Sequence, residues 1–333
     1  MSTTPGVPQY LRKFSAIVGS PNGAGIDFTE FRCSFVVRRG DNQTPNSCDL
    51  RIYNLANNTA NRITNPNEFT EVVIQAGYAG NYGIIFNGTI KQVRLGRIDQ
   101  KDSYVDITAA DGDEAYNFAP ITASLIAGSK PGTVAGFLLD ALKVHGVTGG
   151  GGLYDYGYAP RLSTNGSVRG QVLYGMARDV MRDFAYNNDC AWSIQDGKLT
   201  LIPFTSYIPG AMPLVTPQTG LIGVPEQTQQ GIRVRVLLNP FMRIGTCFLL
   251  KDATINQFRF GLDAASLADN LYLQSVIKQS STGQYYIMNV AHSGDTRGNE
   301  WYTDITCLAA DATIPASAAP NALFAVAPAI PRF

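Results

Sequence analysis

Charge and histidine are both scarce in this chain. Of its 333 residues 16% are charged, with 26 basic and 26 acidic side chains, and only two are histidines. A formal net charge of +0 argues against a general nucleic-acid binder or a polybasic membrane binder, because both need excess positive charge. His145 and His292 leave little scope for histidine-based catalysis, and neither has a Cys or His at metal-ligand spacing. His145 is predicted to end a helix, where a cation favours the helix dipole.

Long apolar runs are also missing. No run approaches the roughly 18 apolar residues that a membrane-spanning helix needs. The stretch from Met1 to Pro8 is polar and lacks the apolar centre of a signal peptide, which predicts that the chain is made and folded in a cytoplasm. The cysteines are odd in number and scattered, which favours buried small hydrophobes over disulfides or metal ligands. They are Cys33, Cys48, Cys190, Cys247 and Cys307.

What the chain does contain is a short sequence motif that occurs twice, which we call the repeated phrase. Tyr104 to Asp111 reads YVDITAAD, and Tyr302 to Asp311 reads YTDITCLAAD. Both runs alternate polar and apolar residues, and each follows a Gly-led apolar run across a polar connection, as in a β-hairpin. Exposed strands also resemble one another by chance over such short lengths. We favour the interpretation that two similar antiparallel β-domains lie at the two ends of the chain.

Residues 1–118 are predicted to form a first tube-like β-barrel. Alternating apolar residues indicate six or more strands, with one short helix from Asn57 to Ile63 that Asn57 or Asn58 would cap. A single sheet of this size would leave an apolar face exposed, which favours a closed barrel or sandwich. The same pattern returns over 221–312, the predicted second barrel. Before the repeated hairpin, its expected strands are 231–238, 244–250, 253–260 and 271–278.

Residues 119–220 are predicted to form a middle α/β domain. One helix is expected to be capped by Thr133, to end at Gly146 and to bury one face, and a second to run from about Val168 to Asn187. The buried faces are assigned to Val134, Phe137, Leu138, Ala141 and Leu142, and to Val172, Leu173, Met176, Val180 and Phe184. Asp196-Gly197 between two strand-like runs predicts a hairpin.

The last residues, 313–333, are rich in Ala and Pro, which predicts a tail without a fold of its own. Such a tail is either disordered or docked on a partner, and the apolar residues spaced along it favour docking.

Three features are candidates for a functional site, and each has a simpler structural explanation. The carboxylates of Asp111, Asp113 and Glu114 suit cation coordination or sugar cleavage, but a solvated turn after a strand is commoner. Gly149 to Gly152 lacks the Lys-Ser/Thr of a phosphate-binding loop, which predicts a flexible loop. The aromatic residues Tyr154, Tyr156, Tyr158 and Trp192 suit sugar stacking, although core or interface packing is favoured. We therefore predict no catalytic, cofactor-binding or metal-binding residue, no cofactor, and a structural or interaction protein rather than an enzyme.

Three stretches carry a family resemblance. Residues 44–55 end in Ile52-Tyr53-Asn54-Leu55 before the short helix; residues 192–199 read WSIQDGKL; and residues 231–240 read GIRVRVLLNP, with Gly245 beyond. In this order they resemble segments of the baseplate hub proteins of contractile-tailed bacteriophages, the phage T4 hub-like group related to the hub part of type VI secretion spikes.

The resemblance implies a mainly β fold with an α/β insert and two tail-tube-like antiparallel barrels per chain. It further implies a homotrimer, whose ring of six barrels is nearly sixfold toward a tail-tube or tube-initiator protein and threefold toward a spike protein. Such a ring would contact other baseplate proteins, let DNA pass through its lumen, and lie in the virion tail after assembly in the host bacterial cytoplasm.

Two other hypotheses stay open. One is a phage-associated cell-wall hydrolase or carbohydrate-binding protein, motivated by Asp111 to Glu114 and by the aromatic residues of the middle region. The other is a tail-tube or tube-terminating protein, which would have one barrel per chain and form true hexamers.

Overall fold

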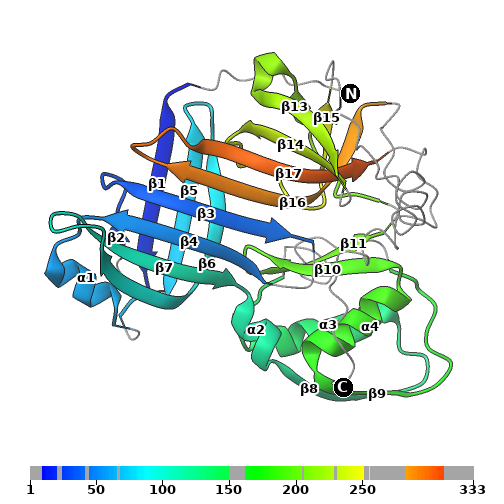
Figure 1. The fold of residues 1–333 in the computed structure, drawn as a ribbon. Coiled ribbons are helices and arrows are strands. Elements are labelled where there is room, and N and C mark those ends of the chain that lie inside the picture. Colours follow the sequence, from blue (N-terminus) through cyan, green and yellow to red (C-terminus); the bar gives the residue numbers. More distant parts are fainter. Residues whose placement is uncertain are drawn as a thin grey trace, which may run out of the picture.

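The computed structural model describes residues 10–20, 25–41, 45–65, 68–149, 162–204, 206–228, 231–250, 255 and 282–310. These residues form one large antiparallel sheet and a smaller α/β region beside it (Figure 1). The prediction of a mainly β protein is confirmed.

The N-terminal end of the chain supplies seven of the described strands. They are β1 (Arg12–Gly19), β2 (Ile26–Asp27), β3 (Cys33–Gly40), β4 (Asn46–Tyr53), β5 (Glu71–Tyr78), β6 (Asn81–Arg97) and β7 (Ser103–Asp111). Along β3, β4 and β7 buried and half-buried residues alternate as the sequence predicts, since every second side chain faces the core. Helix α1 (Asn57–Ile63) has the predicted bounds, but the predicted cap is wrong: Ala56 holds that position and no side chain caps the helix.

The C-terminal end supplies six described strands. They are β12 (Leu214–Val215), β13 (Leu221–Thr228), β14 (Gly231–Leu237), β15 (Cys247–Leu250), β16 (Gln284–Asp295) and β17 (Trp301–Ala309), with a 3-10 turn, η1 (Pro217–Thr219), between β12 and β13. Strand β15 begins later than the predicted 244–250, because Gly245 has a positive φ of 78° and turns the chain. The strands expected at 253–260 and 271–278 lie almost wholly outside the described residues.

The two ends of the chain share one strand order. At the N-terminal end the neighbours run β3-β4-β7-β6-β5-β1, and at the C-terminal end β13-β14-β17-β16-β15-β12. If these six strands are numbered in chain order at each end, both sheets run 2-3-6-5-4-1. They differ in the last pair, because β1 is antiparallel to β5 whereas β12 is parallel to β15. The repeat therefore extends from a short phrase to the topology of six strands.

These two six-stranded units, which we call the N-terminal and the C-terminal repeat, are joined into one sheet. Strand β16 pairs with β3 from Asn289↔Gly40 to Asp295↔Ser34, so that the described residues contain a continuous 13-stranded sheet. Figure 1 shows β14, β17, β16, β3, β4 and β7 as successive strands of this sheet. The side chain of Trp301, at the start of β17, is 1% exposed and lies in the core of the N-terminal repeat. Closure of each repeat into a barrel stays a prediction.

The middle region follows β7. It comprises α2 (Asp113–Phe118), β8 (Pro120–Leu125), α3 (Pro131–Lys143), β9 (Gln171–Met176), α4 (Ala177–Asn187), β10 (Cys190–Gln195) and β11 (Lys198–Pro203). Its separate core contains Leu138, Met181 and Trp192. The predicted hairpin is confirmed, with Asp196 and Gly197 both at positive φ between β10 and β11.

Two helix predictions for this region need correction. The second helix does not begin near Val168: residues 171–176 form β9, which pairs with β8, and only residues 177–187 are helical. Gly175 has a φ of 130°, which an α-helix does not accommodate. In α3 the first helical residue is Pro131 rather than one capped by Thr133, and Phe137 is 43% exposed rather than buried.

All five cysteines are free and buried, as predicted. Among the described residues, no helix is long and apolar enough to span a membrane.

Candidate functional site

A polar sheet face lies opposite the apolar cores of both repeats. On β4 and β7 the side chains of Leu50, Ile52, Val105 and Ile107 are buried, and the residues between them point the other way. The same alternation on β14 and β17 buries Val234 and Ile305. The opposite face therefore carries the polar residues of both repeated hairpins.

Each repeat places an arginine, an aspartate and a tyrosine together on this face. In the N-terminal repeat Arg51 lies directly across from Asp106, and its guanidinium donates two hydrogen bonds to that carboxylate, Nε to Oδ1 at 2.6 Å and Nη2 to Oδ2 at 2.9 Å. The Arg51 guanidinium also lies over the ring of Tyr104, 4.2 Å from its centre. Paired with a carboxylate and stacked on a ring, Arg51 is held in one orientation.

The C-terminal repeat contains the same cluster at equivalent register. Arg235 lies across from Asp304 and donates Nε to Oδ1 at 2.7 Å and Nη2 to Oδ2 at 3.0 Å, while its guanidinium lies 5.6 Å from the ring centre of Tyr302. Tyr104 and Asp106 are the first and third residues of one repeated phrase, and Tyr302 and Asp304 of the other. The Tyr and Asp that the two sequence motifs share therefore make the same contacts with an arginine in both repeats.

Pairing of β16 with β3 makes this face continuous from one cluster to the other. Between them, Nη1 of Arg38 on β3 donates to Oδ2 of Asp49 on β4 at 2.8 Å. Additional arginines approach the two aspartates: Arg94 lies 3.6 Å from Asp106, and Arg233 lies 3.9 Å from Asp304. Carboxylates therefore offset part of the arginine charge on this face, although Asp106 and Asp304 each have two arginines beside them.

A second polar cluster fastens the middle region to the sheet. The carboxylate of Asp111, at the end of β7, accepts hydrogen bonds from the backbone N–H of Asp196 at 2.6 Å and of Gly197 at 2.8 Å. Asn46 donates its Nδ2 to the backbone oxygen of Ile194 at 3.1 Å. Burial raises the pKa of Asp111 to about 6, although the hydrogen bond from Gly197 acts in the opposite direction. We call Asp111, Asn46 and the 194–197 turn the hairpin clasp.

Arg39 and Gln195 extend the hairpin clasp. Nη2 of Arg39 lies 2.9 Å from Oδ2 of Asp196 and donates to Oε1 of Gln195 at 3.2 Å. Nε2 of Gln195 donates to the backbone oxygen of Gly40 at 3.0 Å. The turn predicted from Asp196-Gly197 is thus one part of the middle region that the sheet holds.

The three carboxylates predicted as a candidate site each have a different partner. Asp111 is 2% exposed within the hairpin clasp, Asp113 pairs with Lys91 at 2.9 Å, and Glu114 lies 3.6 Å from Nδ1 of His145. His292 is buried and its Nδ1 hydrogen-bonds to Oγ1 of Thr303 at 2.9 Å; burial lowers its pKa to about 3.

Of the predicted aromatic and glycine-rich candidate sites, the structure describes only part. Trp192 is buried and stacks on Tyr116 in the middle core, which agrees with packing and excludes a sugar-stacking role for this side chain in this conformation. Gly150 to Gly152 and Tyr154, Tyr156 and Tyr158 lie outside the described residues. Within the part of the chain that the structure describes, no three His, Cys, Asp or Glu side chains are grouped as metal ligands.

No protein-family model matches the sequence, and no curated protein matches it by sequence. Solved structures do match its fold. The 43 kDa tail protein of prophage MuSo2 from Shewanella oneidensis aligns with 92% of this chain over 99% of its own, with a TM-score of 0.51 and 9% identity. A tail protein from Neisseria meningitidis MC58 aligns with 93% of this chain over 99% of its own, with a TM-score of 0.53 and 10% identity. The chain has the fold of phage tail proteins.

A type VI secretion component shares this tail-protein fold. It is the Escherichia coli c3393 protein, described as structurally similar to the T4 bacteriophage tail proteins gp27 and gp5. It aligns with 92% of this chain over 78% of its own, with a TM-score of 0.50 and 9% identity. The predicted resemblance to the T4 hub-like group is therefore confirmed at the level of the fold.

Sequence reasoning found the repeated phrase but not the two Arg–Asp–Tyr clusters. The signal was available, because an Arg precedes Ile52-Tyr53 and another precedes Val236-Leu237 on the strand that pairs with each phrase. Finding it requires the register between β4 and β7 and between β14 and β17, which local patterns leave open.

Proposed function

We propose that this protein is the structural baseplate hub of a contractile phage tail. Three chains form a ring with near-sixfold shape on one side, which adapts a hexameric tail tube to a trimeric spike. The observation that supports this most directly is the shared strand order 2-3-6-5-4-1 at the two ends of the chain.

The duplicated fold supports a trimer through symmetry. A threefold ring that must contact a sixfold ring leaves half of the sixfold sites unmatched unless each chain presents two similar surfaces. The clusters around Asp106 and Asp304, with nearly the same hydrogen-bond geometry, are evidence that the two ends of each chain are structurally equivalent. In this proposal residues 1–118 and 221–312 form the two tube-like barrels, residues 119–220 form the middle domain, and residues 313–333 form a tail that contacts a partner.

The polar sheet face is the proposed lining of the DNA channel. A channel for DNA must be wettable but must not hold phosphates tightly, because unpaired cations bind DNA by releasing counterions. On this face Arg38, Arg51 and Arg235 each donate to a carboxylate, which reduces the positive charge that phosphates would meet. The overall charge of +0 agrees with the same requirement.

The proposed partners follow from this geometry. A tail-tube or tube-initiator protein would contact the near-sixfold side, a spike protein the threefold side, and other baseplate proteins the outside. The ring would be assembled in the cytoplasm of a host bacterium and then lie in the virion tail.

The mass of the purified full-length protein under native conditions tests the proposal. We expect a particle three times the mass of one chain, and end-on images with six similar β lobes around a channel. A stable monomer that never joins a tail-like particle would contradict the hub assignment. A particle of six chains would instead support the tail-tube alternative, which the presence of two repeats in one chain disfavours.

The cell-wall hydrolase alternative has a separate test. Asp113, the carboxylate that it would use, is paired with Lys91 at 2.9 Å. In a peptidoglycan gel assay we expect no clearing by the purified protein. Clearing that Asp113→Asn abolishes would support the enzyme instead.

A further inference from the structure

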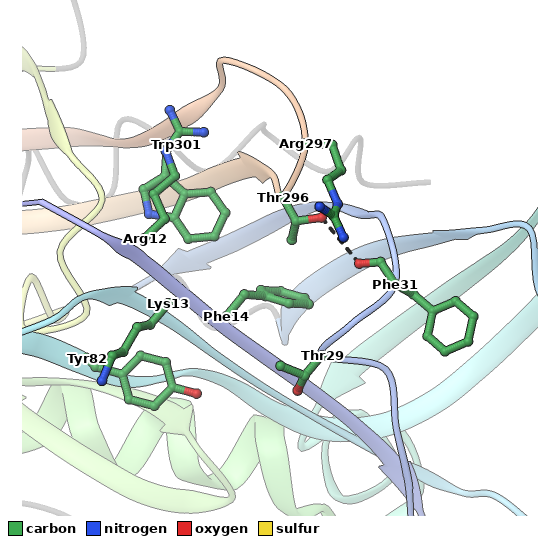
Figure 2. Close-up of a pocket in the computed structure, with 9 residues that line it drawn as sticks. All are labelled: Arg12, Lys13, Phe14, Thr29, Phe31, Tyr82, Thr296, Arg297 and Trp301. Atoms are coloured by element: carbon green, nitrogen blue, oxygen red, sulfur yellow. Dashed lines mark hydrogen bonds between the residues drawn. The ribbon is translucent and has the colours of Figure 1, made fainter.

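A cleft of about 440 Å³ opens beside β1, where the two repeats meet (Figure 2). Of the nine residues that line it, three are cations, four are aromatic and two are threonines. The cations are Arg12, Lys13 and Arg297. No Asp or Glu lines the cleft, so its charge is positive and is not balanced by its own walls.

The cleft surrounds the edge of a strand rather than one face of the sheet. Arg12, Lys13 and Phe14 are consecutive residues of β1, and consecutive side chains of a strand point to opposite faces. A cavity that touches all three must pass around the strand's edge. An occupant of this cleft therefore meets the backbone of β1 as well as its side chains.

The backbone of β1 is open at this edge. Strand β1 pairs with β5 along its whole length, but on its other side only Ile17 and Val18 pair with β2. The backbone oxygen of Ala16 accepts from Phe28 on that other side, while those of Leu11 and Gly19 face residues next to the ends of β5. Because alternate residues of a strand point to alternate edges, the N–H and C=O groups of Arg12 and Phe14 face the open edge.

No pairing with another described residue uses these backbone groups of Arg12 and Phe14. An unpaired strand edge is a template for a further strand. Within the cleft, the edge offers two residues whose N–H and C=O groups can hydrogen-bond to an incoming extended peptide.

Hydrogen bonds and ring packing hold two residues of the cleft wall, Trp301 and Arg12, in place. Trp301 donates its Nε1–H to the backbone oxygen of Gly77 at 3.3 Å, and its ring packs edge-on against Phe14 with ring centres 6.4 Å apart. Arg12 donates to the backbone oxygens of Gly298 at 2.7 Å and Asn299 at 3.1 Å. These contacts fix the position of Arg12 without using a carboxylate to neutralise it.

The other two cations are also without a carboxylate partner among the described residues. Lys13 forms no ion pair with them, and the guanidinium of Arg297 donates to the backbone oxygen of Glu30 at 3.4 Å. The carboxylate of Asp295 accepts from the backbone N–H of Arg297 at 2.9 Å, but its ionic partner is Arg32. Figure 2 shows Lys13 beside Tyr82 on one side of β1, and Arg297 near Thr296 on the far side of the cleft. An extended chain that followed the β1 edge would therefore pass between positive charges.

We propose that this cleft binds an extended, acidic segment of a partner protein, which adds to the free edge of β1 as an extra strand. Main-chain hydrogen bonds to Arg12 and Phe14 would hold the segment, and Asp or Glu side chains would pair with Lys13 and Arg297. The inference does not depend on the oligomeric state and goes beyond the proposed hub role, because it names a docking site and the chemistry of what docks there.

The test uses the full chain and a labelled seven-residue peptide of alternating valine and glutamate, blocked at both ends. We expect saturable binding, which Lys13→Glu and Arg297→Glu each weaken about fivefold or more, because attraction becomes repulsion. Lys198→Glu is the matched control: it makes the same charge change at an exposed residue of β11, outside the cleft, and should leave binding unchanged. Lys13→Gln, with a smaller loss, keeps the test valid if a charge reversal disturbs folding.

Two further peptides separate strand addition from simple charge attraction. A peptide with lysine in place of glutamate should not bind, and one N-methylated at alternate residues should lose most of its affinity, because it cannot complete the ladder. Amide hydrogen exchange in residues 10–19 should slow only with the unmodified acidic peptide.

Three results would overturn the proposal: equal binding of the lysine peptide, equal binding of the N-methylated peptide, or no effect of Lys13→Glu. Tighter binding of a single-stranded oligonucleotide, lost in the same variants, would also overturn it and would assign the cleft to phosphates.

Discussion

At Asp106 and Asp304, the equivalent carboxylate of each repeat is partly buried and accepts two hydrogen bonds from an arginine across the strand pair. Asp41 is in the opposite situation. It is 6% exposed, its backbone N–H donates to the oxygen of Met288, and its Oδ2 accepts from the hydroxyl of Tyr286 at 3.3 Å. No cation pairs with it among the described residues, so burial raises the pKa of Asp41 from its ordinary 3.8 to about 7.

This burial makes a pH-dependent prediction for Asp41→Asn. Because the folded-state pKa is raised, the stability that the protonated carboxyl contributes is fully present below pH 4 and is lost as pH rises through 7. Between pH 5 and pH 8 the parent protein should therefore lose about 2 kcal/mol more unfolding free energy than Asp41→Asn does. Urea unfolding at both pH values measures the difference.

The pKa of Asp111 is raised as well, but the parent protein and Asp41→Asn both contain Asp111. Its contribution to the pH dependence therefore cancels when the two proteins are compared. An equal pH dependence for parent and variant would mean that Asp41 ionises normally in the fold.

At the scale of single elements, the sequence predicts strands more accurately than helix starts. On β4 and β7 every second residue is buried, so alternation in the sequence alone locates the strands. The stretch 168–176 has apolar residues that also fit a helix, but residues 171–176 pair with β8 and form a strand. Pairing with a distant partner is a tertiary contact, which a local pattern does not encode.

The hairpin clasp is an element-scale contact that can be broken at one residue. Asp111→Ala removes the acceptor for the partly buried N–H groups of Asp196 and Gly197 and should lower the unfolding free energy by about 1–3 kcal/mol. Because the lost contact joins β7 to the β10–β11 turn, amide exchange should accelerate first in residues 190–203. Hydrogen exchange followed by mass spectrometry provides the measurement.

Asp113→Ala is the control for this prediction, since it removes a partly exposed ion pair with Lys91 and should cost under about 1 kcal/mol. Similar exchange in the two variants would mean that the middle region is held by its apolar contacts alone.

At the scale of the whole molecule, the sequence reveals the repeat, and the structure reveals how the repeats are joined. The phrase at 104–111 and its counterpart at 302–311 predict related hairpins, and the shared strand order extends that relation. The pairing of β16 with β3 brings together residues about 250 positions apart, and no motif marks either strand as the other's partner. The polar face that results therefore could not be predicted from the sequence, because its residues come together only through this pairing.

If this face lines the proposed channel, neutralising its carboxylates should convert it into a DNA-binding surface. In the double variant Asp106→Asn with Asp304→Asn, Arg51 and Arg235 lose their ionic partners on every chain of the ring. We expect the assembled protein to bind a short DNA duplex at least about tenfold more tightly than the parent at 50 mM salt. Most of that gain should be lost at 200 mM salt, because it comes from counterion release. Fluorescence anisotropy of labelled DNA measures both values.

A matched double variant separates this face from a general effect of charge. Asp140→Asn with Asp179→Asn removes two carboxylates from the exposed sides of α3 and α4, so that its net charge changes by the same amount. Figure 1 shows those helices in the middle region, beside the large sheet rather than among its strands. Because the arginines next to Asp106 and Asp304 are gathered on one surface, only their release should create a continuous path for phosphates. Equal DNA affinity in the two double variants would remove the polar face from the channel and leave the ring to be lined by other residues.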